Sequence, residues 1–189
     1  MKLVNRLFPS KKPAIIEIYG YFDRELEERV KRQVSKAFSS TSKQPDGIIL
    51  LIDSAGGSTS TLATFINNLL KVKFPIMGFV ENEAMSAGAE LLLSCQYRVA
   101  TEFAKICFHH GATKIDVSKI MDVDVCSFLV ANRIAQEKSF LERFRRVTGQ
   151  TEKIARVIYR ADDSMPPSVA LEYGILHEIS NNVYPYKFG

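Results

Sequence analysis

Several features that define common classes of protein are absent from this 189-residue chain. The only cysteines, Cys95, Cys107 and Cys126, form no C-x-x-C pair, and each lies among apolar residues, which predicts buried thiols in a reducing compartment rather than a disulfide framework. No apolar run has the length of a signal peptide or of a membrane-spanning helix. We therefore expect a cytoplasmic protein without a membrane partner.

Nucleotide-binding loops and repeats are absent as well. Neither G-x-x-x-x-G-K-[ST] nor G-x-G-x-x-G occurs, and no linker, low-complexity tract or solenoid repeat divides the chain. The net charge is +4, but the basic residues are scattered among acids. Their densest cluster lies in a helical pattern and predicts a solvated helix face, not a nucleic-acid surface; it comprises Arg143, Arg145, Arg146, Lys153 and Arg156.

What is present is the composition of an ordinary globular domain, with 46% hydrophobic and 24% charged residues. A chain of this length buries enough surface for a layered core without covalent staples. We predict one domain over residues 1–189, with a basic lead-in at 1–13. No cofactor and no metal site are predicted.

Apolar runs and helical apolar periods alternate along the chain. The run at 47–53 is continuous, which favours a strand buried on both faces of a parallel sheet, and strand, polar turn and helix then recur at 75–95. This order predicts an α/β layered fold with crossover connections. The predicted strands cover 14–20, 47–53, 76–80, 97–100, 104–109 and 175–179. The predicted helices cover 23–38, a segment after Ser58, and 122–147, 151–159 and 168–173.

Two turns in this pattern carry chemistry. Ser86 lies where the strand at 76–80 and its polar turn give way to an Ala/Leu-rich helix, so it is either a helix N-cap or a nucleophile. Gly56 and Gly57 follow the buried strand at 47–53, and their amides could donate to an oxyanion. Because the carboxyl ends of parallel strands meet at one edge, we expect both turns to converge there.

A serine nucleophile needs a base, and histidine is the usual one. Of three histidines, His177 near the C-terminus is most simply a surface residue, whereas His109 and His110 end a strand, where one of them could reach the site. The imidazole in turn needs an orienting carboxylate, for which Asp162 and Asp163 are candidates. Paired aspartates before prolines are also common turn formers.

Six motifs, in this order, resemble those of the proteolytic subunit of Clp protease. The resemblance extends from about Ile15 to Ile179. The motifs are Ile52-Asp-Ser-Ala-Gly-Gly-Ser58, Ala84-Met-Ser-Ala-Gly-Ala89, Ile106-Cys-Phe-His-His110, Thr148-Gly-Gln150, Asp162-Asp-Ser-Met165 and Ala170-Leu-Glu-Tyr-Gly-Ile-Leu176.

The resemblance implies a ββα superhelix, as in crotonases, and hydrolysis of peptide bonds inside an oligomeric chamber. It implies that Ser86 is the nucleophile, His109 the base and Asp162 the orienting acid. Gly57 and Ala87 match the oxyanion-hole amides, and Gly56 and Ser58 are expected beside the peptide substrate. The region at about 115–150 matches the protruding helix through which two heptameric rings contact one another, as a tetradecamer.

The chain also departs from the family pattern. Residues 1–13 are shorter than the region that lines the axial pore and helps to dock an unfolding ATPase, which argues against dependence on such a partner. Asp163 adds a second acid where the family often has a basic residue. Three alternatives stay open: a crotonase-type acyl-CoA enzyme, a non-catalytic ring subunit, and a phage or mobile-element processing protease.

Overall fold

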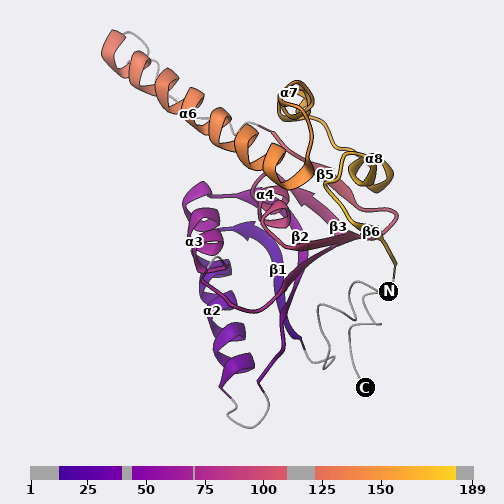
Figure 1. The fold of residues 1–189 in the computed structure, drawn as a ribbon. Helices are drawn as coiled ribbons and strands as arrows, with labels where there is room; N and C mark the ends of the chain where they lie inside the picture. Colours follow the sequence, from indigo (N-terminus) through magenta and orange to yellow (C-terminus); the bar gives the residue numbers. More distant parts are fainter. Residues whose placement is uncertain (1–12, 40–43, 70, 110–121, 182–189) are drawn as a thin grey trace.

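The computed structural model describes residues 13–39, 44–69, 71–109 and 122–181. Helices and strands alternate through the first half, and three helices dominate the second half (Figure 1). In chain order the elements are β1 (Ala14–Phe22), α2 (Arg24–Phe38), β2 (Ile48–Gly57), α3 (Thr59–Leu69), β3 (Ile76–Met85), α4 (Ala87–Leu93), β4 (Tyr97–Ala100), β5 (Lys105–Cys107), α6 (Val123–Thr148), α7 (Glu152–Ala161), α8 (Pro167–Glu172) and β6 (Glu178–Ile179).

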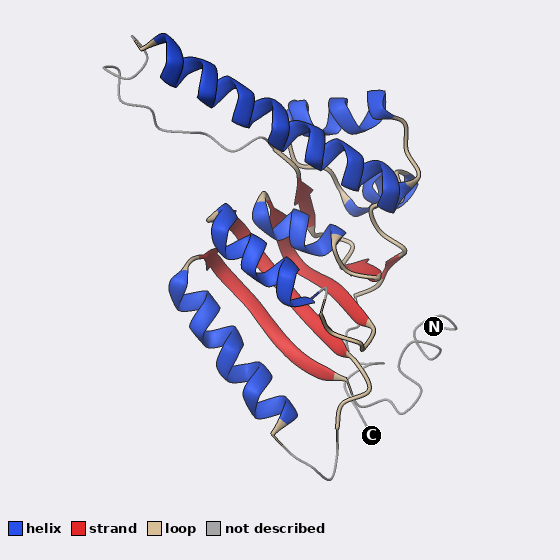
Figure 2. Cartoon of the chain, turned by 60° about the vertical axis from the view of Figure 1, so that its left-hand side comes forward, coloured by secondary structure: helices blue, strands red, loops and turns tan. Residues whose placement is uncertain are grey.

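The sheet is parallel, as the buried apolar runs predict. Its strand order is β1-β2-β3-β4-β6, and β5 pairs with the distal part of β3. Helices α2, α3 and α4 lie on one face of this sheet (Figure 2). Alternate residues of β2 enter two apolar clusters, Ile48, Leu50 and Ile52 on the helix side and Ile49 and Leu51 on the other. A strand buried on both faces has no reason to alternate with polar residues.

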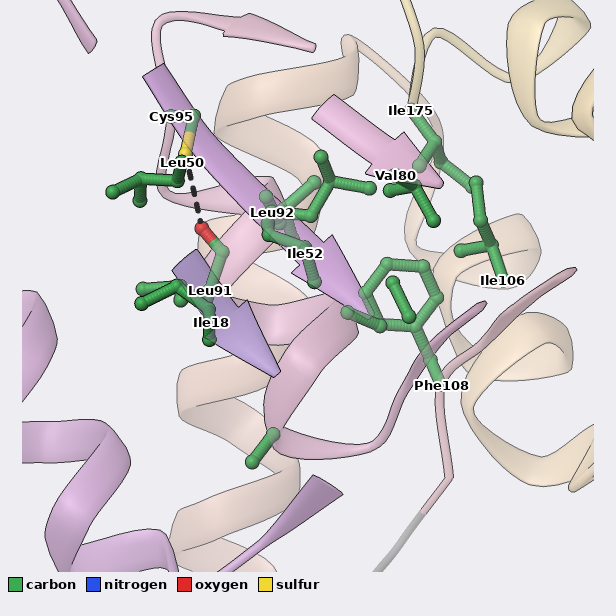
Figure 3. Packing of buried hydrophobic residues seen from close by; sticks show 14 of the residues in the cluster. Ile18, Leu50, Ile52, Val80, Leu91, Leu92, Cys95, Ile106, Phe108 and Ile175 are labelled. Carbon is green, nitrogen blue, oxygen red and sulfur yellow. Dashed lines mark hydrogen bonds between the residues drawn. The ribbon is translucent and has the colours of Figure 1, made fainter. Parts of the chain in front are cut away.

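The larger apolar cluster joins the sheet to α4. Leu91 and Leu92 are fully buried against β2, and the thiol of Cys95 donates to the carbonyl of Leu91 at 3.4 Å (Figure 3). Burial raises the pKa of Cys95 to about 12. The prediction of buried thiols is confirmed for Cys95 and Cys107 but is wrong for Cys126, which is half-buried on α6.

Two strands are longer than predicted. Residues 54–57 continue β2 because Gly56 and Gly57 pair with Tyr21 and Phe22 of β1, so these glycines belong to an extended strand rather than to a turn. Residues 81–85 continue β3, and the last three of them, Glu83 to Met85, pair with β5. Their polar side chains do not predict a strand, because the pairing depends on β5, about twenty residues further on in the chain. The last predicted strand, 175–179, shortens to Glu178–Ile179. The Ile175 carbonyl accepts a hydrogen bond from Arg98 Nε at 2.6 Å, so it does not pair with a neighbouring strand.

The predicted helix starts are confirmed by their caps. Asp23 accepts a hydrogen bond from the Leu26 amide at 2.8 Å, Thr151 accepts one from the Ile154 amide at 3.3 Å, and Asp122 accepts two amides at the start of α6. These bonds satisfy backbone donors that the first turn of a helix otherwise leaves without partners.

Helix α6 has two unlike halves. Its C-terminal half buries Phe140, Leu141 and Phe144, whereas its N-terminal half projects away from the sheet (Figures 1 and 2). The exposed fractions of Phe128 and Ile134 in the projecting half are 66% and 62%. This confirms that part of the predicted long helix leaves the domain core. The segment that precedes it, at 110–121, lies outside the described residues and includes His110 and the start of the region expected at 115–150.

The basic cluster is partly ion-paired and partly exposed. Arg143 binds Glu90 of α4, and Arg156 binds Glu137 of α6 at 2.5 Å and Glu152 of its own helix at 2.7 Å. Arg146 and Lys153 are exposed, as the expected solvated face requires. Among the described residues, no helix has the length and apolar character needed to cross a membrane.

An aromatic cluster attaches α6 to the body of the molecule. The ring of Phe144 is fully buried and lies 5.7 Å from Phe108 and 5.5 Å from Phe140, whose own ring stacks on Tyr159 at 4.5 Å. Phe108 directly precedes His109. The cluster therefore holds the end of β5 against α6 and α7.

Replacing Phe144 with alanine should lower the free energy of unfolding by about 3–5 kcal/mol, the usual cost of emptying a buried aromatic site. Urea unfolding followed by circular dichroism measures this. The matched control is Phe103→Ala, since Phe103 is 83% exposed and its loss should cost less than about 0.5 kcal/mol. Equal costs for the two variants would contradict the packing described here.

Candidate active site

Ser86 joins β3 to α4 in an unusual backbone conformation. Its φ and ψ are 51° and −117°, and its side chain makes no capping hydrogen bond although it occupies the N-cap position. Residues other than glycine rarely adopt a positive φ. The backbone strain of this conformation persists only where the surrounding structure imposes it. A sharp strand-to-helix turn of this kind presents a hydroxyl outward. Ser86 thus holds the position of a cap without its hydrogen bond.

Strand β5 brings three distant segments together. Its Cys107 carbonyl accepts the Ser86 amide at 2.9 Å, and Ile106 forms an antiparallel bridge with Met165, with hydrogen bonds of 3.1 and 2.8 Å. His109 follows two residues after Cys107. The nucleophile candidate, the histidine and the segment after Asp162 are therefore placed by one short strand.

His109 and Asp162 face each other. The distance from His109 Nδ1 to Asp162 Oδ1 is 3.5 Å, and their side chains are 30% and 60% exposed. Asp162 ends α7 as its C-cap with φ of 51°. The carboxylate of Asp163 instead accepts the Ser164 amide at 2.7 Å. The structure thus brings the carboxylate of Asp162 to the histidine.

The pKa of Cys107 reflects the proximity of Asp162 and Asp163 to β5. Burial first, and then the charges of Asp162 and Asp163, raise the pKa of the Cys107 thiol. A buried thiol with a raised pKa is a poor nucleophile at neutral pH. The serine is therefore the better nucleophile candidate at this edge of the sheet.

Gly56 lies directly against the serine junction, and Gly57 lies against β1. At Gly56, where φ is +102°, a Cβ would lie 2.6 Å from Ser86 Cβ and 3.2 Å from the Ala87 amide nitrogen. At Gly57, where φ is +143°, a Cβ would lie 2.6 Å from the Phe22 amide nitrogen. Neither position has room for a side chain. The backbone of this segment can therefore lie directly against Ser86 and the first turn of α4.

The remaining predicted residues lie around this junction. Ala87 is buried as the first residue of α4. Ser58 precedes α3, where its amide donates to the Phe22 carbonyl at 2.7 Å and its Oγ accepts the Thr61 amide at 3.4 Å. Its side chain therefore serves the start of α3, and its backbone carbonyl also accepts the Leu62 amide at 3.1 Å.

Sequence reasoning misses one polar residue at this site. Ser54 is 1% exposed at the start of the segment that leads to Gly56. A serine at the end of a continuous apolar run, directly before two glycines, is the signal that could have found it.

His177 is a surface residue, as expected, and it also makes specific contacts. Its ring stacks on Tyr97 with the centroids 5.1 Å apart, and its Nδ1 accepts the Arg98 amide at 3.1 Å. Partial burial of the ring in these contacts, and then the charge of Arg98, lower the pKa of His177 to about 4. These contacts tie His177 to β4, away from the strand that ends at His109.

A cavity of about 630 Å³ lies elsewhere, between α2 and α3. Its walls are mostly apolar and include Val34, Phe38 and Phe65, and none of the candidate site residues lines it. Within the described residues, no group of three or more His, Cys, Asp or Glu side chains is arranged to hold a metal ion.

Comparison with known proteins identifies a family and a shared fold. A family model described as Clp protease matches residues 2–183. Many solved structures share the fold, among them a point mutant of ClpP1 from Listeria monocytogenes, with a TM-score of 0.76 and 20% sequence identity over 97% of this chain and 99% of that one. No curated protein sequence matches the chain.

Proposed function

Because the chain belongs to the Clp protease family, a family of peptidases, we propose that it is a serine endopeptidase that uses Ser86, His109 and Asp162. The proposal is supported by the contacts around β5: the Ser86 amide donates to Cys107, two residues before His109, and His109 Nδ1 lies 3.5 Å from Asp162 Oδ1. A 3.5 Å contact is longer than an ideal hydrogen bond, and catalytic contacts of this kind tighten when substrate binds.

In the proposed reaction, Ser86 Oγ attacks the scissile carbonyl carbon while His109 Nε2 takes the hydroxyl proton. Asp162 holds the imidazole through Nδ1 and stabilises the imidazolium. The proton then passes to the leaving amine as the peptide bond breaks, which leaves an acyl ester on Ser86. Water, activated by the same histidine, hydrolyses this ester and restores the enzyme.

Two backbone amides would donate hydrogen bonds to the negatively charged carbonyl oxygen of the tetrahedral intermediate. The Ala87 amide lies at the N-terminus of α4, where the helix dipole favours negative charge. The Gly57 amide would come from the opposite side, on the segment that abuts Ser86. Loss of one such donor typically costs about 2.7–4 kcal/mol of transition-state stabilisation. An extended peptide would pair beside Gly56 and Ser58, in the manner of an added strand.

The projecting half of α6 supports assembly into stacked rings. It carries apolar side chains that the isolated chain leaves exposed: Val123, Phe128, Val130 and Ile134. Such a patch is typical of an interface. We propose heptameric rings in pairs, which enclose the active sites in a chamber, in the cytoplasm. Native mass spectrometry should then give a particle of about fourteen subunits, and a monomer would contradict the chamber.

The experiment that tests the serine chemistry is labelling of the assembled protein with a fluorophosphonate probe. Peptide mass mapping should place the probe on Ser86, and prior denaturation should abolish the reaction. Absence of labelling in assembled protein would overturn the proposal. Binding of an acyl-CoA by such an unlabelled protein would favour the crotonase-type alternative, which needs an oxyanion hole but no triad.

A further inference from the structure

A buried serine lies directly behind the proposed oxyanion hole. The Ser54 hydroxyl donates to the Gly20 carbonyl at 2.5 Å and accepts the Gly56 amide at 3.1 Å. The residue is 1% exposed, and its bond to the Gly56 amide is buried, whereas Gly20 lies at the surface. A single side chain thus links β1 to the glycine segment at the end of β2.

The sheet is irregular at this place. The register of β1 against β2 shifts between Tyr19 and Tyr21, and that of β2 against β3 shifts between Ile52 and Ser54. Gly20, at the first shift, has φ of +88°. Register shifts interrupt the regular ladder of backbone hydrogen bonds. The Ser54 hydroxyl therefore supplies bonds to the Gly20 carbonyl and the Gly56 amide where the ladder is irregular.

Ser54 also contacts the other side of the proposed site. A Cβ placed on Gly88 would lie 3.1 Å from the Ser54 carbonyl oxygen and 3.4 Å from Ser54 Cβ. Gly88 is the second residue of α4 and directly follows Ala87. Ser54 is therefore hydrogen-bonded to the segment that supplies the Gly57 amide and packed against the turn that supplies the Ala87 amide.

We propose that Ser54 is a positioning residue that sets the separation and direction of the two oxyanion donors, Gly57 and Ala87. This inference rests on the proposed function. A donor assists catalysis only if it is aimed at the place where charge develops in the transition state, so its supports must be rigid. Ser54 touches neither substrate nor the reacting atoms, and its effect should appear in the transition state rather than in binding of the peptide.

Steady-state hydrolysis of a fluorogenic peptide tests this with Ser54→Ala. We expect kcat to fall by about tenfold to a hundredfold while KM changes by less than about threefold, because the loss concerns an interaction made only in the transition state. A peptide boronate, whose adduct with serine is tetrahedral, should bind more weakly by a similar factor. A product peptide, which forms no adduct, should bind with unchanged affinity.

Two comparisons separate the hydroxyl from general packing. Ser94→Ala is the matched control, since Ser94 ends α4 and its hydroxyl also donates to a backbone carbonyl, that of Glu90 at 2.9 Å; its kcat should stay within about twofold of wild type. Ser54→Thr and Ser54→Val have nearly the same shape, and only the threonine retains the hydroxyl. We expect Thr to recover most of the activity and Val to resemble Ala.

The outcomes are decisive in each direction. Wild-type protein without hydrolysis or labelling would overturn the proposed function and this inference together. Active wild type with Ser54→Ala equal to Ser94→Ala would overturn the inference alone. Equal activities of the Thr and Val variants would also overturn it. A Ser54→Ala chain that fails to assemble would show that the hydroxyl serves the fold instead.

Discussion

Replacement of Ser86 by alanine should reduce kcat for hydrolysis of a fluorogenic peptide by at least about 10⁴-fold, because no covalent acyl intermediate can then form. The substitution removes one oxygen atom and no capping hydrogen bond, since the Ser86 side chain makes none. Helix α4 should therefore persist. The backbone contact from the Ser86 amide to the Cys107 carbonyl does not involve the side chain and should also remain.

Rates per assembled particle, with particle size checked on each preparation, measure this effect. Ser94→Ala is again the control, because it removes a hydroxyl from the same helix without touching the junction. A Ser86→Ala protein that retains more than a tenth of wild-type turnover would rule out serine nucleophilic catalysis. Ser86 would then have only a structural role, in the backbone turn between β3 and α4.

Replacement of Asp162 by asparagine should reduce kcat by about 10⁴-fold, whereas Asp163→Asn should change it by less than about threefold. The carboxylate that faces His109 Nδ1 selects the tautomer in which Nε2 can act as the base, and an amide can select the wrong one. Asparagine tolerates the left-handed backbone of Asp162, whose φ is 51°, so the substitution changes the charge and leaves the turn intact.

The two variants control for each other, because they make the same chemical change at adjacent, exposed positions. Asp163 accepts a hydrogen bond from its neighbour Ser164, and asparagine can accept it too. The pH dependence of kcat/KM, measured for both, separates loss of the base from a general loss of stability. A larger effect at Asp163 than at Asp162 would transfer the orienting role to Asp163.

Much of the fold is predictable because its signals are local. The run Ile48–Ile52 is apolar at every position and becomes a strand buried on both faces. Asp23, Asp122 and Thr151 each cap a helix at the predicted place, because a cap needs only its own first turn. The same local pattern places Ser86 at a junction between strand and helix.

The errors arise where one segment pairs with a distant one. Glu81–Met85 is polar enough to suggest a turn, yet it is strand, and its last three residues pair with β5. Gly56 and Gly57 suggest a tight turn, yet they pair with Tyr21 and Phe22. Local sequence carries no record of such partners, since strand pairing depends on register over the whole sheet.

For Ser86, the sequence by itself determined the position between strand and helix and the order of glycine pair, serine, histidine and aspartate along the chain. It left the serine as either a cap or a nucleophile, and the acid as Asp162 or Asp163. Only the tertiary structure decided that Ser86 holds φ of 51° without a capping bond, that Asp162 lies against His109, and that Ser54 supports the glycine segment. The physical reason is that caps and periods are satisfied within a few residues, whereas these contacts exist only after β1, β2, β3 and β5 have aligned.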